Sequence, residues 1–534
     1  MWRRLIAALF VAVVQSGPIP SLGLAGVAGA VGQEARGSTR CSQLTNLQIP
    51  GVAVVVSKAE WHDAGPAPVQ PPPARPIAGN LPGYCRVDGT IDRRSGANGK
   101  RYGIGFALAL PDNWNGRFLF QGGGGLNGTV QPPFGAQAAG NTPGLARGFA
   151  VVSTDSGHEG AVFDGSFFAD QQASLDFAYV AVGRVTVMAK QIVAQYYGRP
   201  ADHSYFAGCS TGGREAMLMT ERYPTYFDGV VAGAPAMRTG FSGIGDRWAA
   251  VAFNQIAPKD SAGKPIPSQA FSDGDKTLIV NRLLEACDGR DGVKDGMIFN
   301  TQACAFDPDA LKCTGAKTDG CLTPQQAGAL KKAFAGPKDS RGTQVYPGFL
   351  YDTGITAAGQ GIPGLLSPGP SPLGPPNLAT DLDVDREAAA AAASPQAAIS
   401  DTAGWTNLNA FSGRGGKLLF FHGVSDPWFS ALDTVGYYQR VGRDNGGSDQ
   451  VQGWSRLFLA PGMGHCSGGT AALDTFDLLG AVVNWVEQGA APDAVIATGR
   501  AFSGRSRPLC AYPTYAHYKG SGNPDDAKNF ECRK

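Results

Sequence analysis

The sequence contains no block of lysine or arginine residues, and its 45 basic and 44 acidic side chains leave a net charge of only +1. Proteins that bind nucleic acid or anionic membranes present clustered positive charge, so the composition argues against both as partners. None of the ten cysteines forms a C-x-x-C pair, which argues against a structural zinc site. The 534 residues suit one large domain with an insertion, or two or three domains.

Beyond the N-terminus no apolar run is long enough to span a bilayer, and the run at the N-terminus is also too short. It covers residues 5–14, follows Arg3 and Arg4, and precedes Ala28-Gly29-Ala30, which fits an A-x-A cleavage site. We therefore expect residues 1–30 to be a signal peptide, and the mature protein to be secreted or periplasmic. A permanent membrane anchor is the alternative.

An exported chain with ten cysteines is expected to form disulfides. The sequence alone does not fix their connectivity. Pairing neighbours along the chain gives Cys41–Cys85, Cys287–Cys304, Cys313–Cys321 and Cys510–Cys532, and leaves Cys209 with Cys466.

Predicted strands and helices alternate along two parts of the chain. Residues 31 to about 100 are expected to be irregular. Strands are predicted at 104–110, 117–120, 149–154, 203–207, 417–421 and 456–459, and helices at 174–197, 214–223 and 476–487. This alternation predicts an α/β fold with a mostly parallel sheet and helices on both of its faces.

Residues 236–404 interrupt the alternation, because they carry little strand signal and many prolines and glycines. We interpret them as a lid domain inserted into a core made of residues 31–235 and 405–534. A lid over the mouth of the core would set specificity.

The stretch Gly208-Cys209-Ser210-Thr211-Gly212 reads G-x-S-x-G between a predicted strand and a predicted helix. This is the context of a nucleophile elbow, in which a tight turn holds a serine hydroxyl at the end of a sheet. A glycine-rich loop that contains a serine by chance is the alternative.

A second glycine run, residues 122–125, directly follows the predicted strand at 117–120. Hydrolases with such an elbow place half of their oxyanion hole there, because backbone N–H groups must approach the developing negative charge closely. The N–H of Thr211, the residue after the serine, would be the other donor. An ordinary flexible loop is the alternative.

A serine nucleophile needs a base, and the base needs an acid to orient it. Ser210, Asp426 and His465 occur in the chain order Ser–Asp–His, and the acid and the base each follow a predicted strand. Asp155 and His158 are rival groups, but they precede the serine and would break this order.

Side chains around the acid are candidates for a substrate pocket. Trp428 and Phe429 form an aromatic pair that would suit a planar acyl ring, or they pack against the lid. His422 lines the pocket or is a hydrogen-bonded core residue. If Cys209 is bonded to Cys466, that disulfide would hold the nucleophile and the base in register.

The elbow Gly-Cys-Ser-Thr-Gly-Gly-Arg, the acid Asp426 and the segment Pro461-Gly-Met-Gly-His-Cys-Ser-Gly-Gly resemble the tannase/feruloyl esterase family. The resemblance runs from about Cys41 to Cys532. It implies an α/β-hydrolase core with a lid, the five disulfides paired as above, and an oxyanion hole formed by Gly125 and Thr211.

The resemblance also implies hydrolysis of aromatic-acid esters, such as feruloyl or galloyl esters, which plant polysaccharide or tannin can carry. The family's bacterial members include mono(2-hydroxyethyl) terephthalate hydrolases, so that activity is the runner-up. A terephthalate monoester would need a cation, and residues 352–385 contain none, although Arg386 follows. A non-catalytic binding protein, a thioesterase or a peptidase are further alternatives.

The lid sequence Cys-Asp-Gly-Arg-Asp-Gly-Val-Lys-Asp-Gly-Met, residues 287–297, brings three aspartates together at short spacing. Oxygen ligands from such a loop can converge on Ca²⁺. The expected ligands, which the resemblance also implies, are the carboxylates of Asp288, Asp291 and Asp295 and the carbonyls of Val293 and Met297. The ion would be structural, because hydrolysis by a serine needs no metal. A solvated acidic turn is the alternative.

Overall fold

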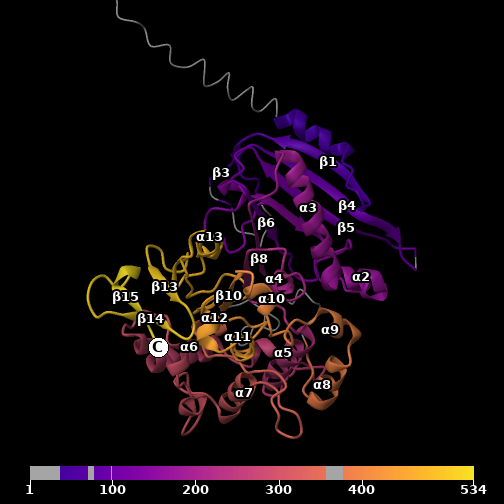
Figure 1. Cartoon of the computed structure of the whole chain (residues 1–534). Coiled ribbons are helices and arrows are strands. Elements are labelled where there is room, and N and C mark those ends of the chain that lie inside the picture. Colours follow the sequence, from indigo (N-terminus) through magenta and orange to yellow (C-terminus); the bar gives the residue numbers. More distant parts are fainter. Residues whose placement is uncertain (1–36, 70–76, 78, 98, 357–376) are drawn as a thin grey trace, which may run out of the picture.

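The computed structural model describes residues 37–69, 77, 79–97, 99–356 and 377–534 (Figure 1). The expected signal peptide, residues 1–30, lies outside the described residues. The expectation that no apolar run beyond the N-terminus is long enough to span a bilayer is wrong by length and composition, because the helical stretch Gln171–Tyr197 is long and apolar enough. However, 61% of its most apolar window is buried inside the protein.

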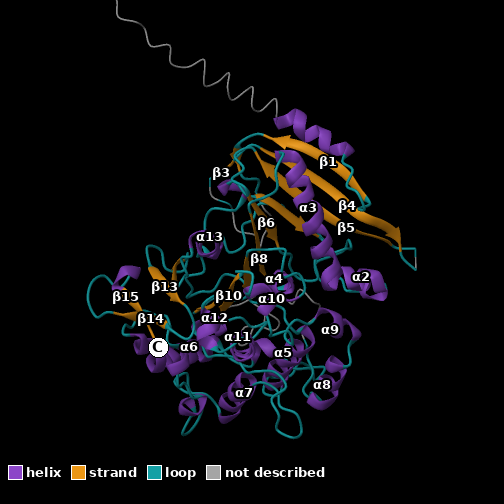
Figure 2. Ribbon diagram, viewed as in Figure 1, coloured by secondary structure: helices purple, strands orange, loops and turns teal. Residues whose placement is uncertain are grey.

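A nine-stranded sheet forms the centre of the core (Figure 2). The three pairings at the β1 end are antiparallel and the other five are parallel, which confirms the predicted mostly parallel sheet. The strands, in spatial order, are β1 (Val54–His62), β4 (Tyr84–Ser95), β5 (Arg101–Pro111), β7 (Ala150–Thr154), β6 (Arg117–Gln121), β8 (His203–Cys209), β9 (Gly229–Gly233), β10 (Lys417–Gly423) and β11 (Ser455–Ala460).

The prediction that residues 31 to about 100 are irregular is wrong, because two long strands, β1 and β4, lie there. Both belong to the antiparallel end of the sheet, and β1 is its edge strand. Every second residue along most of β4 is only partly buried, and charged side chains occupy several of those positions. A strand with one solvent-exposed face has few apolar residues, so the hydrophobic pattern in its sequence is weak.

Alternate side chains of the parallel strands enter two apolar layers, one on each face of the sheet. In β8, Phe206 packs into the layer of α3 (Ala181–Tyr197) and α4 (Thr211–Glu221). Its neighbour Tyr205 packs into the opposite layer with α13 (Leu478–Gln488). The period-2 alternation of a strand buried on both sides therefore places helices on both faces, as the sequence predicts.

The described part of residues 236–404 contributes helices to the molecule but no strand to the sheet. It contains an apolar core of its own, with Phe253, Leu283 and Leu330. Figure 1 shows most of these helices gathered at the end of the molecule opposite β1. The exact domain boundaries stay a prediction. The helices between β9 and β10 are α5 (Thr239–Asn254), α6 (Asp273–Cys287), α7 (Pro324–Ala335), α8 (Val384–Ala392), α9 (Pro395–Ser400) and α10 (Asn409–Ser412).

The predicted closing helix, α13, is not the last element of the chain. Two small antiparallel hairpins follow it: β12 (Ala494–Thr498) with β13 (Ser506–Cys510), and β14 (Tyr515–Tyr518) with β15 (Phe530–Arg533). Strand β14 contacts the turn Asp288–Asp291 at the end of α6, so the C-terminus rests on the inserted segment. Two further helices, α11 (Ala431–Asp444) and α12 (Ser448–Gln452), lie between β10 and β11.

Five disulfides form, and their connectivity confirms the pairing expected from the family resemblance. Four of them close loops of 8 to 44 residues, whereas Cys209–Cys466 joins positions 257 residues apart. That disulfide therefore connects the two parts of the core.

Candidate active site

Ser210 occupies the sharp turn between β8 and α4, with φ 65° and ψ −124°. A residue with a side chain reaches this region only at an energetic cost, so the surrounding structure must hold it there. The Ser210 N–H donates to Gly233 O at 3.0 Å, and its carbonyl accepts from Arg214 and Ala236. A Cβ added at Gly208 would lie 2.3 Å from the carbonyl oxygen of Gly212, so this turn requires glycine.

The glycine run, residues 122–125, lies directly against the elbow. The Gly212 N–H donates to Gly123 O at 3.0 Å, and the Thr211 hydroxyl donates to Gly125 O. Among the described residues neither the N–H of Thr211 nor that of Gly125 has an acceptor. Both N–H groups are therefore free to donate to a ligand, as the expected oxyanion hole requires.

Asp426 and His465 meet at the carboxyl ends of β10 and β11. His465 Nδ1 lies 2.7 Å from Asp426 Oδ2, and Asp426 Oδ1 accepts the N–H groups of Trp428 and Phe429 at 2.9 and 3.2 Å. Burial acts to raise the pKa of the Asp426 carboxyl, but the charge of His465 and hydrogen bonds from His465 and His422 hold it well below its ordinary value. Asp426 is therefore a fixed anion beside the imidazole.

The second ring nitrogen of His465, Nε2, has no hydrogen-bond partner in the part of the chain that the structure describes. A disulfide between the neighbouring residues Cys209 and Cys466, whose Cα atoms are 5.9 Å apart, joins the segment of Ser210 to that of His465. In the absence of substrate, hydrogen bonds between nucleophile and base are often long. The arrangement leaves Nε2 free to accept the serine proton.

His422 is a core residue and does not line a pocket. Its side chain is fully buried, its Nδ1 lies 2.8 Å from Thr434 Oγ1, and its Nε2 lies 2.9 Å from Phe429 O and 3.4 Å from Asp426 Oδ2. Because a carbonyl only accepts, Nε2 carries the proton and points it toward the acid loop. Of the two roles considered for His422, the structure supports the hydrogen-bonded core residue.

Trp428 and Phe429 form an aromatic wall beside His465. The Trp428 ring stacks on the imidazole with centroids 5.4 Å apart, and the Phe429 ring meets it edge-on at 5.2 Å. Phe163 extends the wall, 5.7 Å from Trp428. Trp428 and Phe429 are both half-buried beside His465.

Asp155 and His158, the rival acid and base, are each held by contacts with other residues of the core. Asp155 accepts the N–H groups of Gly105 and Gly157, and burial raises its pKa to about 8. His158 is buried with its ring stacked on Phe167 at 3.7 Å, and burial lowers its pKa to about 4. No hydrogen bond within the described residues links the two as an acid and base pair.

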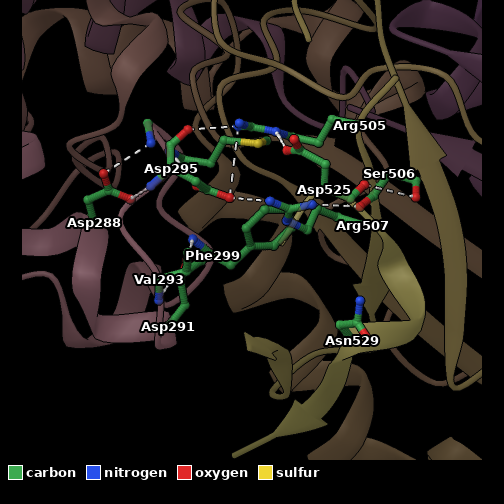
Figure 3. A network of polar contacts seen from close by, with 12 residues as sticks. Asp288, Asp291, Val293, Asp295, Phe299, Arg505, Ser506, Arg507, Asp525 and Asn529 are labelled. Carbon is green, nitrogen blue, oxygen red and sulfur yellow. Dashed lines mark hydrogen bonds and ion pairs between the residues drawn. The ribbon is translucent and has the colours of Figure 1, made fainter. Parts of the chain in front are cut away.

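The expected calcium loop places its aspartates in two different environments (Figure 3). Asp288 accepts the N–H groups of Asp295 and Gly296, and Asp291 accepts those of Val293 and Phe299. Within the described residues neither Asp288 nor Asp291 has a basic partner, although both are buried.

Asp295 faces the β12–β13 hairpin instead. Its carboxylate forms a close ion pair with Arg507, which is fully buried, and lies 3.8 Å from Arg505. In the described part of the chain no group of three His, Cys, Asp or Glu side chains is close enough to hold a metal ion. The donor chemistry of hard oxygens suits Ca²⁺, and two of the three carboxylates are buried without a counter-charge. Sequence reasoning missed both arginines, because they lie more than 200 residues away.

Comparison with known proteins gives consistent matches along most of the chain. A family model described as tannase and feruloyl esterase matches residues 85–366 and 377–533. The chain is 38% identical to mono(2-hydroxyethyl) terephthalate hydrolase of Piscinibacter sakaiensis, over 90% of this chain and 89% of that protein. It is 31% identical to a probable feruloyl esterase of Arthroderma benhamiae, over 92% and 93%.

Solved structures share the fold. Feruloyl esterase B from Aspergillus oryzae superposes with a TM-score of 0.74 at 27% identity, over 93% of this chain and all of that one. Tannin acyl hydrolase from Aspergillus niger has a TM-score of 0.71 at 21% identity, over 93% and 94%.

We expect Asp426→Asn to lower kcat by about 10⁴-fold at pH 7, because the imidazole loses the anion that fixes its tautomer. The matched control is Asp155→Asn. Since burial raises the pKa of Asp155 to about 8, its carboxyl is mostly uncharged at pH 7 and an amide mimics it. We expect its kcat to stay within a few-fold of wild type. Ester hydrolysis rates measure both; a larger loss in Asp155→Asn would contradict the assignment.

Proposed function

The chain belongs to the tannase and feruloyl esterase family and is a carboxylic ester hydrolase, and on that premise we propose that it cleaves esters of aromatic acids by acyl transfer to Ser210. The feruloyl and galloyl esters are the substrate class that fits best. The single observation that carries this choice is the half-buried aromatic wall of Trp428 and Phe429 next to the base. A flat acyl ring can stack there while its carbonyl approaches the serine.

The reaction begins when Ser210 Oγ attacks the ester carbonyl and His465 Nε2 takes its proton. Asp426 holds the other ring nitrogen and stabilises the imidazolium that forms. The negative charge that develops on the carbonyl oxygen is met by the N–H groups of Thr211 and Gly125. Collapse of this intermediate expels the alcohol, which takes the proton from His465 and leaves the acyl group on Ser210. His465 then takes a proton from water, which attacks the acyl group. Ser210 Oγ leaves with that proton, and the acid is released.

Terephthalate monoester hydrolysis is the second candidate, because the relative from Piscinibacter sakaiensis is named for it and is 38% identical. The free carboxylate of that substrate calls for a cation. Arg386, the arginine named from the sequence, lies 3.2 Å from one carboxylate oxygen of Glu387, and Arg247 lies 2.8 Å from the other, so both arginines are paired on the inserted segment. This pairing favours an uncharged aromatic acyl group over an anionic one.

Export to an oxidising compartment also belongs to the proposal. All ten cysteines are paired in disulfides, which persist in secreted and periplasmic proteins and are rare in the cytosol. The ester substrate of an exported enzyme can be attached to plant polysaccharide or tannin.

We also propose that the loop at residues 287–297 binds a structural Ca²⁺. Asp288 and Asp291 and the carbonyls of Val293 and Met297 would hold it, and Asp295 would join them by turning its carboxylate away from Arg507. Two buried carboxylates without a basic partner support the proposal, since a bound cation would offset the cost of their burial. The ion would order the inserted segment against the β12–β13 hairpin and would take no part in hydrolysis.

The substrate proposal predicts that methyl ferulate and methyl gallate are hydrolysed faster than the hydroxyethyl monoester of terephthalate and a short aliphatic ester. Initial rates on these four esters measure the ranking, and Ser210→Ala is expected to abolish turnover of all of them. A preference for the terephthalate monoester would select the second candidate, and Arg386→Ala and Arg247→Ala would then identify its cation. Turnover that survives in Ser210→Ala would exclude this serine as the nucleophile.

The calcium proposal predicts that a chelator lowers the melting temperature by several degrees, and that added Ca²⁺ restores it. It also predicts faster tryptic cleavage at Arg290 and Lys294, which lie within the loop and are exposed. Asp291→Asn should remove the response to Ca²⁺. The control, Asp309→Asn, changes a half-buried aspartate paired with Lys312 and Lys331 on the same segment, and should keep the response to Ca²⁺. Melting and cleavage that ignore the chelator would refute a calcium site here.

A further inference from the structure

Glu215 is a fully buried glutamate on α4, five residues after Ser210. Its carboxylate makes three hydrogen bonds, and all three donors come from the loops around the glycine run. Oε2 accepts the N–H of Gly123 at 2.8 Å, while Oε1 accepts from Asn127 Nδ2 and from Ser156 Oγ, both at 2.9 Å. A buried carboxylate with this set of partners is not explained by packing alone.

Both backbone polar groups of Gly123 are hydrogen-bonded to residues of α4. Its N–H donates to Glu215, and its carbonyl accepts from the N–H of Gly212 at 3.0 Å. Without these bonds a run of four glycines would have more backbone freedom than any other sequence of its length. The two bonds fix the start of the run relative to the helix that carries the nucleophile.

The far end of the run is held by the same carboxylate. Asn127 has φ 55° and Ser156 has φ 64°, conformations that few residues with side chains adopt. The amide of Asn127 also contacts the Ser156 hydroxyl closely, so the two side chains meet at Glu215 Oε1. Gly125 therefore lies between two anchored residues, Gly123 and Asn127.

We propose that Glu215 is a positioning residue that sets the oxyanion hole, by holding the glycine run at a fixed place against the nucleophile helix. The inference rests on the proposed function, because it needs the Gly125 N–H to act in hydrolysis. Polarity is central to it. As placed here, all three partners of Glu215 donate, and a carboxylate offers acceptors to all of them at once. A glutamine that keeps its oxygen on the Gly123 N–H turns its NH₂ group toward Asn127 and Ser156, whose amide and hydroxyl must then reorient to accept.

Glu215→Gln therefore separates positioning from packing. We expect kcat on methyl ferulate to fall by about 10- to 100-fold, because a small displacement of an oxyanion donor weakens stabilisation of the transition state. KM should change by less than about threefold, since the aromatic wall that would bind the acyl ring is untouched. The rate at which a fluorophosphonate labels Ser210 should fall along with kcat.

Glu221→Gln is the matched control. Glu221 ends the same helix, has the same chemistry, and contacts the Tyr437 hydroxyl at 3.3 Å instead of the glycine run. Burial raises the pKa of the Glu221 carboxyl well above its ordinary value, so an amide is a close mimic of its neutral form. We expect its kcat and KM to match those of wild type.

A second substitution tests the polarity directly. In Glu215→Gln with Asn127→Asp, the new carboxylate at 127 accepts from the glutamine NH₂, and the glutamine oxygen can still accept from Gly123. We expect the kcat of the double variant to be at least tenfold above that of Asn127→Asp alone, in which the new carboxylate would face that of Glu215. Ser156→Ala, which removes one donor and keeps the carboxylate, should lower kcat by about 3- to 10-fold and provides the test if Glu215→Gln does not fold.

The outcomes distinguish this inference from the proposed function. An active wild type that depends on Ser210, together with a Glu215→Gln variant as active as Glu221→Gln, would overturn the positioning role and leave the proposed function intact. A parallel loss in kcat and melting temperature with no recovery in the double variant would assign Glu215 to packing. Wild-type turnover that survives Ser210→Ala would overturn the proposed function itself.

Discussion

The strained turn at Ser210 is the constraint on which the site depends. A serine with φ 65° is held there only because the chain on every side of it is fixed. Glycine at 208 lets Gly212 approach, the N–H of Ser210 is bonded to β9, and the N–H of Gly212 is bonded to the glycine run. The same contacts that impose the turn also fix Ser210, the proposed nucleophile, relative to the N–H groups proposed to meet the developing charge.

The two parts of the core meet at this turn. The serine and the glycine run come from the strands before the inserted segment, whereas the acid and the base come from β10 and β11 after it. The Cys209–Cys466 disulfide joins the turn to the histidine loop across 257 residues. Asp352 joins the inserted segment to the second part of the core, because its buried carboxylate accepts from Ser425 Oγ at 2.7 Å and from the Gly462 N–H at 2.6 Å. The inserted segment is thus hydrogen-bonded to the loops that carry Asp426 and His465.

Local signals in the sequence predicted much of this site, because a strand, a turn and a helix around Ser210 are consecutive in the chain. Strand ends predicted Asp426 and His465 for the same reason. The hydrophobic pattern does not reveal the strands β1 and β4, because about half of their residues are polar and one face of each is partly exposed to solvent. The roles of Glu215 and Arg507 depend on partners far away in the sequence, and a glutamate on a helix or an arginine in a hairpin carries no mark of burial. Such long-range polar contacts become visible only when the fold brings the elements together.

Acyl transfer to Ser210 is tested most directly by trapping the intermediate. An activated ester, 4-nitrophenyl ferulate, should acylate the enzyme faster than water releases the acid, so that acid quenching within the burst captures the adduct. Peptide mass spectrometry is expected to place the feruloyl group on Ser210, in an amount that matches the burst of 4-nitrophenol. A burst whose adduct maps to another residue, or steady turnover of the ester with Ser210 replaced by alanine, would contradict the mechanism.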